Sequence, residues 1–374
     1  MSKYGIKERP DQTQQLLSWH GGKIYEAAQR WGVSPDEVLD FSANINPLGP
    51  PQSVASAIED ACRSARIRSY PDDQLFVDAL VSKHQLTPDE IVVGSGTASL
   101  MFAVMHALVP KRVLLLEPAF AEYARSCDAV NAEITWWPLT EENGFMPDFA
   151  RLLSVIKERQ FDLVIINSPH NPTGNLYPRA SLLSLVTASE EQGTVVVLDE
   201  AFIDYATEES LIELAPTKHQ LIVLRSLTKF YSMPGLRVGY AICNASMASK
   251  VRRQIDPWSI SMVALEAAHA ALKDDDFIAE SLSSNATARD EFMTALRDIG
   301  LLVFPSHANF LLVKLPKGSG TELQHWLDSE RILIRRCDSF LGLGDAFIRL
   351  AVRRSSENMR LVSLVKLWLN ESGV

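Results

Sequence analysis

The chain has 374 residues, of which 47% are hydrophobic and 22% are charged. This length exceeds one minimal domain, and the apolar content supports a large buried core, so the composition excludes a disordered chain. The formal net charge of −10 is not accompanied by any basic block, which argues against a nucleic-acid surface or an anionic membrane as a partner. We expect an anionic substrate to be bound by a few localised arginines.

Cysteine spacing and hydropathy further limit the class of protein to which the chain can belong. The cysteines at positions 62, 127, 243 and 337 form no CxxC pair and no zinc-ligand cluster, so we expect reduced thiols and no metal site. The longest apolar runs are about half the length that a membrane span requires, and the polar N-terminus lacks the apolar core of a signal peptide. We therefore expect a cytoplasmic protein that does not enter a membrane.

In the first ninety or so residues the sequence predicts a helix after Gly22, followed by the turn-rich stretch FSANINPLGPP at 41–51. From about residue 91, short apolar runs alternate with amphipathic segments of helical length, which predicts parallel βαβ units. Because these runs are apolar throughout, we expect strands that are covered on both faces. The predicted strands are 91–93, 113–116, 134–137, 163–166, 195–198 and 221–224.

After about residue 245 the predicted strands and helices follow one another in a different pattern. A helical segment at 262–272 leads into strands predicted at 301–304, 310–313, 332–335 and 347–352, with helices near 321–329 and 356–369. This pattern predicts a smaller α/β domain appended to the large one. We assign 1–50 to an N-terminal segment that contributes to the active site and the small domain, 51–260 to the large domain, and 261–374 to the small C-terminal domain.

Four motifs follow predicted strands. The first, GSGTAS at 94–99, opens a helix, where glycines allow close backbone approach and helix amides can bind a phosphate. An ordinary capped turn is the alternative interpretation. The second, SPHNPTG at 168–174, lies at the carboxyl edge where α/β sheets bind ligands, and it offers Asn171 as a side-chain donor. A plain turn is again the alternative, because every residue of NPTG favours turns.

The third motif, VLDEAF at 197–202, places the Asp199 carboxylate at the end of an apolar strand. A buried carboxylate is costly unless it is paired, so we expect Asp199 to meet a cation, with a helix N-cap as the alternative. The fourth motif, SLTKFYSMPGLR at 226–237, places Lys229 just past another strand and Arg237 eight residues later. Burial or a nearby cation lowers the pKa of a lysine and frees its lone pair to attack a carbonyl, whereas an exposed surface lysine is the alternative.

Together the motifs supply a phosphate-binding turn, an amide for a ring hydroxyl, a carboxylate for a ring nitrogen and a Schiff-base lysine, all of which pyridoxal 5'-phosphate needs. Longer stretches add to this pattern: HGG at 20–22, LDFSANINPLG at 39–49, DEAFIDY at 199–205, RSLTKFYSMPGLRVGY at 225–240, PWS at 257–259 and ILIRRC at 332–337. From about residue 19 to 370 the chain resembles the fold type I pyridoxal-phosphate enzymes of the aminotransferase superfamily. Within it, the chain is most similar to the L-threonine-O-3-phosphate decarboxylases of cobalamin biosynthesis, close to the histidinol-phosphate aminotransferases.

The resemblance implies an α/β fold with a mostly parallel seven-stranded sheet in the large domain. It also implies that Lys229 forms the Schiff base, Asp199 pairs with the pyridinium nitrogen and Phe120 stacks on the ring. Asn171 would bind the ring hydroxyl. The cofactor phosphate would be bound by Gly96, Thr97, Ala98, Ser226, Thr228 and Arg237. Tyr70 matches a tyrosine that reaches the cofactor phosphate of a partner subunit, which implies a homodimer.

On the substrate side, the resemblance implies that Arg335 and Arg349 bind a small phosphorylated amino acid, since guanidinium groups match phosphate and carboxylate geometry. Surface salt bridging is the alternative. The other implied substrate-binding residues are His20, Gly21, Gly22, Asn44 and Asn171, with Lys23 as a further candidate. Phe202 stands where many aminotransferases have tyrosine, a change that the decarboxylases share. The chain departs from the decarboxylase pattern at Lys23, Thr97, Ala98 and Phe340.

The implied reaction is decarboxylation of L-threonine O-3-phosphate to (R)-1-amino-2-propanol O-2-phosphate and CO2, with L-serine O-phosphate as a further substrate. Transamination of the histidinol-phosphate type is the alternative, because the reaction depends on which bond at Cα stands perpendicular to the ring. A second alternative is a non-catalytic pyridoxal-phosphate regulator. Such a protein usually carries a DNA-binding module, and we find no spare segment of about 60 residues for one.

Overall fold

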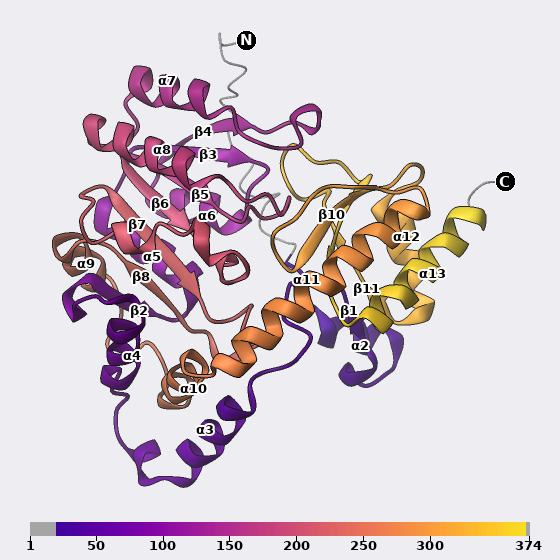
Figure 1. Ribbon diagram of the computed structural model, residues 1–374, viewed down its shortest axis with the longest axis horizontal. Helices are drawn as coiled ribbons and strands as arrows, with labels where there is room; N and C mark the ends of the chain where they lie inside the picture. The colour runs from indigo at the N-terminus through magenta and orange to yellow at the C-terminus, as the bar shows by residue number, and fades with distance from the viewer. Residues whose placement is uncertain (1–19, 372–374) are drawn as a thin grey trace.

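A computed structural model describes residues 20–371 of the chain. Its main element is a seven-stranded sheet in the order β2-β8-β7-β6-β5-β3-β4 (Figure 1). The strands are β2 (Ile91–Gly94), β3 (Arg112–Glu117), β4 (Glu133–Pro138), β5 (Leu163–Asn167), β6 (Val195–Asp199), β7 (Leu221–Ser226) and β8 (Gly239–Ile242). Strand β8 runs antiparallel to β2 and β7, and the other neighbouring strands are parallel.

Alternate side chains of these strands enter two separate cores, one on each face of the sheet. In β6, Val196 and Leu198 join one core, whereas Val195 and Val197 join the other. The first core also receives side chains of α3 (Gln52–Arg63), α4 (Gln74–His84), α7 (Phe149–Arg159) and α8 (Arg179–Gln192). The second receives those of α5 (Gly96–Leu108), α6 (Ala121–Asp128) and α9 (Ala245–Arg252). The expectation of strands covered on both faces is confirmed.

All six strands predicted for the large domain are present, but we did not predict β8. Its four residues, GYAI, follow the motif at 226–237 after one further residue, and they start with a glycine rather than with an unbroken run of Val, Ile and Leu. The structure pairs Gly239 with Gly94 and with Ser226, so this strand ties the ends of β2 and β7 together.

The small domain contains a four-stranded sheet in the order β12-β13-β10-β9. The strands are β9 (Leu302–Val303), β10 (Phe310–Lys314), β12 (Arg335–Arg336) and β13 (Phe347–Ala351), and they pack with α11 (Asp275–Asp298), α12 (Gly320–Leu327) and α13 (Ser355–Glu371). The N-terminal segment adds α2 (Ile24–Trp31) and β1 (Leu39–Asp40), and β1 pairs in parallel with β11 (Ile332–Leu333). The strand predicted at 332–335 is therefore wrong as one unit, because its first half pairs with β1 and its last residue pairs with β13.

Helix α10 (Met262–Leu272) contacts α3 and α4, and its buried side chains join the core of the large sheet. The sequence placed this segment in the small domain, because an alanine-rich helix does not reveal which core it enters. In the next helix, α11, Phe277 near the start joins the core of the large sheet, and Phe292 further along joins the core of the small domain. Figure 1 shows α11 running from α10 toward α12. We therefore propose a domain boundary within α11 rather than at residue 261. Over residues 20–371, no helix is long and apolar enough to cross a membrane.

Candidate active site

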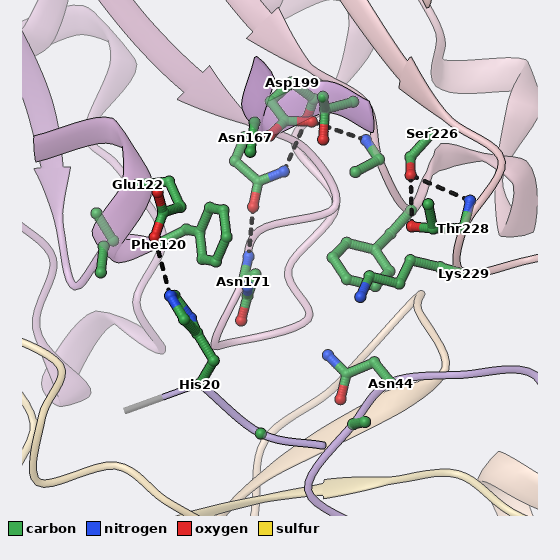
Figure 2. A pocket seen from close by; sticks show the side chains of 18 of the residues that line it. His20, Asn44, Phe120, Glu122, Asn167, Asn171, Asp199, Ser226, Thr228 and Lys229 are labelled. Atoms are coloured by element: carbon green, nitrogen blue, oxygen red, sulfur yellow. Dashed lines mark hydrogen bonds and ion pairs between the residues drawn. The ribbon is translucent and has the colours of Figure 1, made fainter. Parts of the chain in front are cut away.

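A cavity of about 340 Å³ lies where the large domain, the small domain and the N-terminal segment meet (Figure 2). The predicted residues that line it are His20, Gly21, Asn44, Thr97, Ala98, Phe120, Asn171, Asp199, Ser226, Thr228, Lys229, Arg237, Arg335 and Arg349. Gly22, Gly96 and Tyr70 are not part of its wall. The cavity lies at the carboxyl edge of the sheet because Asn167, Asp199 and Ser226 end three neighbouring parallel strands.

Lys229 follows β7 and faces the cavity from the side opposite Phe120 (Figure 2). Burial lowers the pKa of its ammonium group to about 8, and the positive charges of Arg349 and Arg237 act in the same direction. An amine attacks a carbonyl only in its neutral form, so this environment makes Lys229 more reactive at neutral pH than an exposed lysine.

Asp199 ends β6 and is buried, which raises the pKa of its carboxyl group to about 6. Two donors oppose this rise by stabilising the charged form: the Tyr123 hydroxyl at 2.6 Å from Oδ2 and the Ala201 amide at 3.0 Å from Oδ1. A carboxylate has about four acceptor positions, so two remain for a cationic ligand.

The sequence reasoning missed Tyr123 and Asn167. The Asn167 amide group donates to the Asp199 carbonyl at 2.7 Å and accepts a hydrogen bond from the Asn171 backbone at 2.7 Å. This pair of bonds fixes the loop after β5 against the end of β6. A signal was available in both cases, since Asn167 is the last residue of a predicted buried strand and Tyr123 lies three residues after Phe120, in the first turn of the next helix.

The residues predicted to bind the cofactor phosphate form a compact group. Helix α5 starts at Gly96, so the amides of Thr97 and Ala98 belong to its first turn, where backbone donors have no partner within the helix. Gly96 has a φ of +84°, and a Cβ there would lie 2.7 Å from Nη2 of Arg237. A glycine is thus needed for the guanidinium group to approach the helix N-terminus, an arrangement that favours a bound phosphate.

Two hydroxyl groups, on Ser226 and Thr228, complete this group at the end of β7. Their Oγ and Oγ1 atoms lie 2.8 Å apart, and both residues are buried in the cavity wall. The members of this phosphate-binding group that line the cavity are Thr97, Ala98, Ser226, Thr228 and Arg237, and Phe120, Asp199 and Lys229 line it too. The donor set therefore fits pyridoxal 5'-phosphate, with anion binders at one end, a carboxylate for the ring nitrogen and an amine for the aldehyde.

Arg335 and Arg349 occupy directly opposite positions on the antiparallel strands β12 and β13. Both side chains are buried and line the cavity. Burial lowers the pKa of Arg349 to about 9, and the charge of Arg335 lowers it further in the same direction. Arg349 donates Nη1 to Asn171 Oδ1 and Nη2 to the Ser42 carbonyl at 3.0 Å, whereas its Nε has no partner among the described residues.

Arg335 lies between Ser339 and Phe340 and, unlike Arg349, also lines a neighbouring cavity. It donates Nη2 to Ser339 Oγ at 2.8 Å, and its guanidinium carbon lies 4.9 Å from the centre of the Phe340 ring. Phe340, which differs from the decarboxylase pattern, therefore stacks against this cation. Phe202, the other aromatic departure, lines the cavity and packs against Phe310 without offering a hydrogen bond.

The N-terminal segment forms the remaining wall. Gly21 lacks a side chain where a Cβ would collide with the Ser42 carbonyl group, and the Gly22 amide donates to Ser42 Oγ at 2.8 Å. Asn44 is buried, and its Oδ1 has no hydrogen-bond partner among residues 20–371. His20 pairs with Glu122, a residue that the sequence reasoning missed, at 2.9 Å between Nε2 and Oε1.

Tyr70 lies outside the cavity, with 75% of its surface exposed, and its ring stacks on that of Trp258 at 4.2 Å. Its expected contact with a partner subunit's cofactor stays a prediction. The part of the chain that the structure describes holds no group of three or more His, Cys, Asp or Glu that could bind a metal ion.

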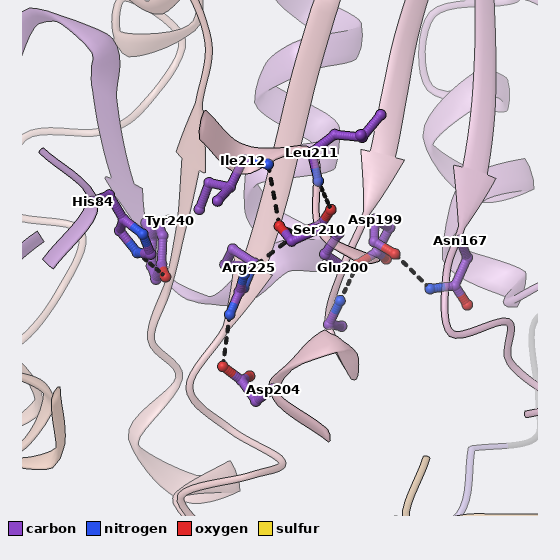
Figure 3. A network of polar contacts seen from close by, with 11 residues as sticks. His84, Asn167, Asp199, Glu200, Asp204, Ser210, Leu211, Ile212, Arg225 and Tyr240 are labelled. Atoms are coloured by element: carbon purple, nitrogen blue, oxygen red, sulfur yellow. Dashed lines mark hydrogen bonds and ion pairs between the residues drawn. The ribbon is translucent and has the colours of Figure 1, made fainter. Parts of the chain in front are cut away.

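A buried ionic network lies on the face of the large sheet opposite to the side chains that line the cavity (Figure 3). Arg225 donates to Asp204 Oδ1 at 2.7 Å and to Glu200 Oε2 at 3.3 Å. Because side chains alternate along a strand, the residues next to this network, Asp199 and Ser226, point into the cavity instead. Each of the two strand ends thus holds one charged residue for the network and one polar residue for the cavity.

The close approach of Gly96 and Arg237 gives a first prediction. Gly96→Ala would displace the guanidinium group, and we expect at least tenfold weaker binding of pyridoxal 5'-phosphate, since a charge-assisted hydrogen bond contributes about 1.5–3 kcal/mol. Absorbance titration of the cofactor-free protein measures this affinity. Gly144→Ala is the matched control, because Gly144 also has a positive φ, of +63°, but its Cβ would meet nothing within 4 Å. Equal affinities for the two variants would contradict the assignment.

The network also predicts a pH dependence of stability. His84 lies 2.9 Å from the Tyr240 hydroxyl, and burial, followed by the charge of Arg225, lowers the pKa of His84 from 6.5 to about 3. The unfolded chain binds this proton below about pH 6.5 and the folded protein does not, so the stabilisation is present above pH 6.5 and is lost as the pH falls toward 3. We expect the melting temperature of the cofactor-free His84→Gln protein to fall less steeply on acidification than that of the wild type. His106→Gln, at an exposed position, should follow the wild type, and parallel curves for all three would refute this reading.

Comparison with known proteins agrees with this geometry. The family model for aminotransferase class I and II matches residues 36–363. The threonine-phosphate decarboxylase of Salmonella typhimurium is 37% identical over 354 residues, which cover 93% of this chain and 96% of that protein. The crystal structure of the histidinol-phosphate aminotransferase from Clostridium acetobutylicum matches with a TM-score of 0.83 and 32% identity, covering 89% of this chain and 100% of that one.

A second solved structure shares the fold. The histidinol-phosphate aminotransferase from Sinorhizobium meliloti, solved in complex with pyridoxal-5'-phosphate, matches with a TM-score of 0.84 over 98% of this chain and 99% of that one, at 23% identity. The family match and the fold agree with the constellation of Lys229, Asp199 and the phosphate-binding group. The chain therefore belongs to the aminotransferase class I and II family, with the fold type I architecture, and the donor set of its cavity fits pyridoxal 5'-phosphate.

Proposed function

We propose that this enzyme decarboxylates L-threonine O-3-phosphate to (R)-1-amino-2-propanol O-2-phosphate and CO2, in the aminopropanol arm of cobalamin biosynthesis. The likeness to the Salmonella typhimurium threonine-phosphate decarboxylase over nearly the whole of both chains supports this proposal. L-Serine O-phosphate is a further substrate, since one methyl group contributes only about 1 kcal/mol of discrimination.

The observation that carries the proposal is the pair of buried guanidinium groups on β12 and β13. Like charges directly opposite each other on neighbouring strands repel, and within residues 20–371 neither Arg335 nor Arg349 forms a hydrogen bond or ion pair with a carboxylate. A substrate with two anionic groups a few bonds apart would neutralise both. L-Threonine O-3-phosphate carries a carboxylate and a phosphate at this spacing, whereas histidinol phosphate carries one anionic group and a bulky imidazole.

We assign the carboxylate to Arg349 and the phosphate to Arg335. Arg349 is bonded to Asn171 and lines the same cavity as Lys229, so it can hold a group attached directly to Cα. Arg335 also lines a neighbouring cavity, so it can hold the longer arm of the substrate. His20, Gly21 and Asn44 close the opposite wall, and the unpaired Oδ1 of Asn44 can accept a hydrogen bond from the substrate.

Pyridoxal 5'-phosphate, when bound, supplies an electron sink for the pair left on Cα after a bond there breaks. The protein residues orient the reacting groups and supply the proton. Asp199 holds a negative charge against the ring nitrogen, which favours its protonated form. Arg349 orients the carboxylate that leaves as CO2. The electron pair of the broken C–C bond stays on Cα, and Lys229 Nζ, with its pKa lowered to about 8, is placed to deliver the proton that replaces the carboxylate.

We also propose a homodimer. The stacked side chains of Tyr70 and Trp258 are 75% and 58% exposed, and Ile67 and Leu75, on either side of Tyr70 in the chain, are also exposed. A second copy of the chain would cover this apolar surface and bring Tyr70 to the cofactor phosphate of the partner subunit.

The reaction gives the next prediction. With L-threonine O-3-phosphate as the sole substrate, we expect the purified enzyme to release CO2 and form one equivalent of the amino alcohol phosphate. Lys229→Ala should lose the visible absorbance of the lysine-bound cofactor and at least a thousandfold in turnover, because it removes both the amine and the proton donor. Manometry or a coupled CO2 assay measures the first product. With 2-oxoglutarate added as the amino acceptor, formation of a 2-oxo acid from L-threonine O-3-phosphate without CO2 would move the enzyme to the transaminases.

The division of roles between the two arginines gives a separate prediction. Because each charge-assisted contact contributes about 1.5–3 kcal/mol, Arg335→Gln should lower kcat/KM ten- to hundredfold for L-threonine O-3-phosphate, with little effect on residual activity toward L-threonine. Arg349→Gln should lower kcat/KM for both. Arg336→Gln is the matched control, since its side chain contacts Thr321 and Asp338 rather than the active-site cavity. If Arg335→Gln affected both substrates equally, the phosphate would be bound elsewhere.

A further inference from the structure

The side chain of Asp199 has two donors from the protein, and they are of different kinds. The Ala201 amide bonds to Oδ1 at 3.0 Å and belongs to the backbone two residues further along the same chain segment. The Tyr123 hydroxyl bonds to Oδ2 at 2.6 Å and comes from α6, an element that follows β3 rather than β6. The orientation of the carboxylate therefore depends on a contact between two elements that are distant in sequence.

Tyr123 is itself held firmly. Its ring is buried and packs edge-to-face against Phe120, with 5.6 Å between the ring centres and an interplanar angle of 82°. Its backbone amide donates to the Phe120 carbonyl at 3.1 Å. Phe120 is the residue expected to stack on the cofactor ring, and it caps the same helix. One turn of α6 thus carries both the ring-stacking group and the donor to Asp199.

We propose that Tyr123 is a positioning residue that acts through Asp199: its hydroxyl fixes the carboxylate in the orientation in which it meets the nitrogen of the cofactor ring. This inference rests on the proposed role of Asp199. It assigns to Tyr123 no contact with the substrate or the reacting atoms.

Electrostatics leads to the same assignment. A buried carboxylate favours its neutral form, and the Tyr123 hydrogen bond opposes that tendency. Burial raises the pKa of Tyr123 well above 10, so the hydroxyl keeps its proton and remains a donor over the working pH range. Without this hydroxyl, Asp199 would keep the Ala201 bond alone, and Oδ2 would be free to turn away from the ring nitrogen or to take up a proton.

The test compares two cofactors on three proteins. Pyridoxal 5'-phosphate and its 1-deaza analogue, in which carbon replaces the ring nitrogen, are titrated into the cofactor-free wild type, Tyr123→Phe and Tyr177→Phe. Tyr177 is the matched control, because it is equally buried but its hydroxyl has no hydrogen-bond partner among the described residues. Melting temperatures of the cofactor-free proteins report whether the fold is preserved.

We expect Tyr123→Phe to bind pyridoxal 5'-phosphate at least tenfold more weakly than the wild type, and to bind the deaza analogue within about twofold of the wild type. The reason is that the charge-assisted hydrogen bond contributes to affinity only when the ring nitrogen is present. Tyr177→Phe should match the wild type on both. An equal loss on both cofactors, no loss on either, or a marked fall in the melting temperature of Tyr123→Phe alone would overturn the proposal.

A fourth variant separates this inference from the role of Asp199. If Asp199→Asn discriminates between the two cofactors as well as the wild type does, the pairing of Asp199 with the ring nitrogen is wrong. If Asp199→Asn loses that discrimination and Tyr123→Phe keeps it, the pairing stands and only the positioning role of Tyr123 is wrong.

Discussion

The buried carboxylate of Asp199 is the constraint around which the site is built. Burial disfavours its charge, and the protein offsets this with donors drawn from two elements, Tyr123 on α6 and the amide of Ala201 after β6. Lys229 carries the opposite charge, and burial and two neighbouring guanidinium groups disfavour its ammonium form. A cofactor with a cationic ring nitrogen and an aldehyde suits both residues, because the nitrogen pairs with the Asp199 carboxylate and the aldehyde reacts with the neutral amine of Lys229.

The parallel sheet makes this arrangement possible. Strands β5, β6 and β7 end at one edge, so Asn167, Asp199 and Ser226 come together although they are far apart in the chain. Alternation along the strands then separates two kinds of polar group. The cavity receives the binding residues, and the opposite face receives Arg225 and its carboxylate partners, which link the same strand ends (Figure 3). The active-site residues are therefore supported by contacts that never reach the ligand.

Much of this could be predicted from the sequence, for identifiable reasons. Continuous apolar runs predicted six of the seven strands of the large sheet, and the rule that ligands bind at strand ends brought Asp199 and Lys229 into one site. Strand β8 was missed because GYAI begins with glycine and lacks the unbroken run of Val, Ile and Leu that marks most of the other strands. The segment around Ile334 was predicted as one strand because pairing partners are not visible in a single sequence. Tyr123 and Glu122 were missed for a related reason, since their importance lies in contacts with Asp199 and His20, 76 and 102 residues away.

The assignment of a decarboxylase within this family depends on how Cα is oriented over the ring, and a structure of the Lys229→Ala protein with cofactor and L-threonine O-3-phosphate measures it directly. We expect the substrate phosphate on Arg335, the carboxylate within reach of Arg349, and the bond from Cα to the carboxylate standing close to perpendicular to the ring plane. A carboxylate lying in the ring plane with the Cα–H bond perpendicular would contradict the account and indicate transamination instead.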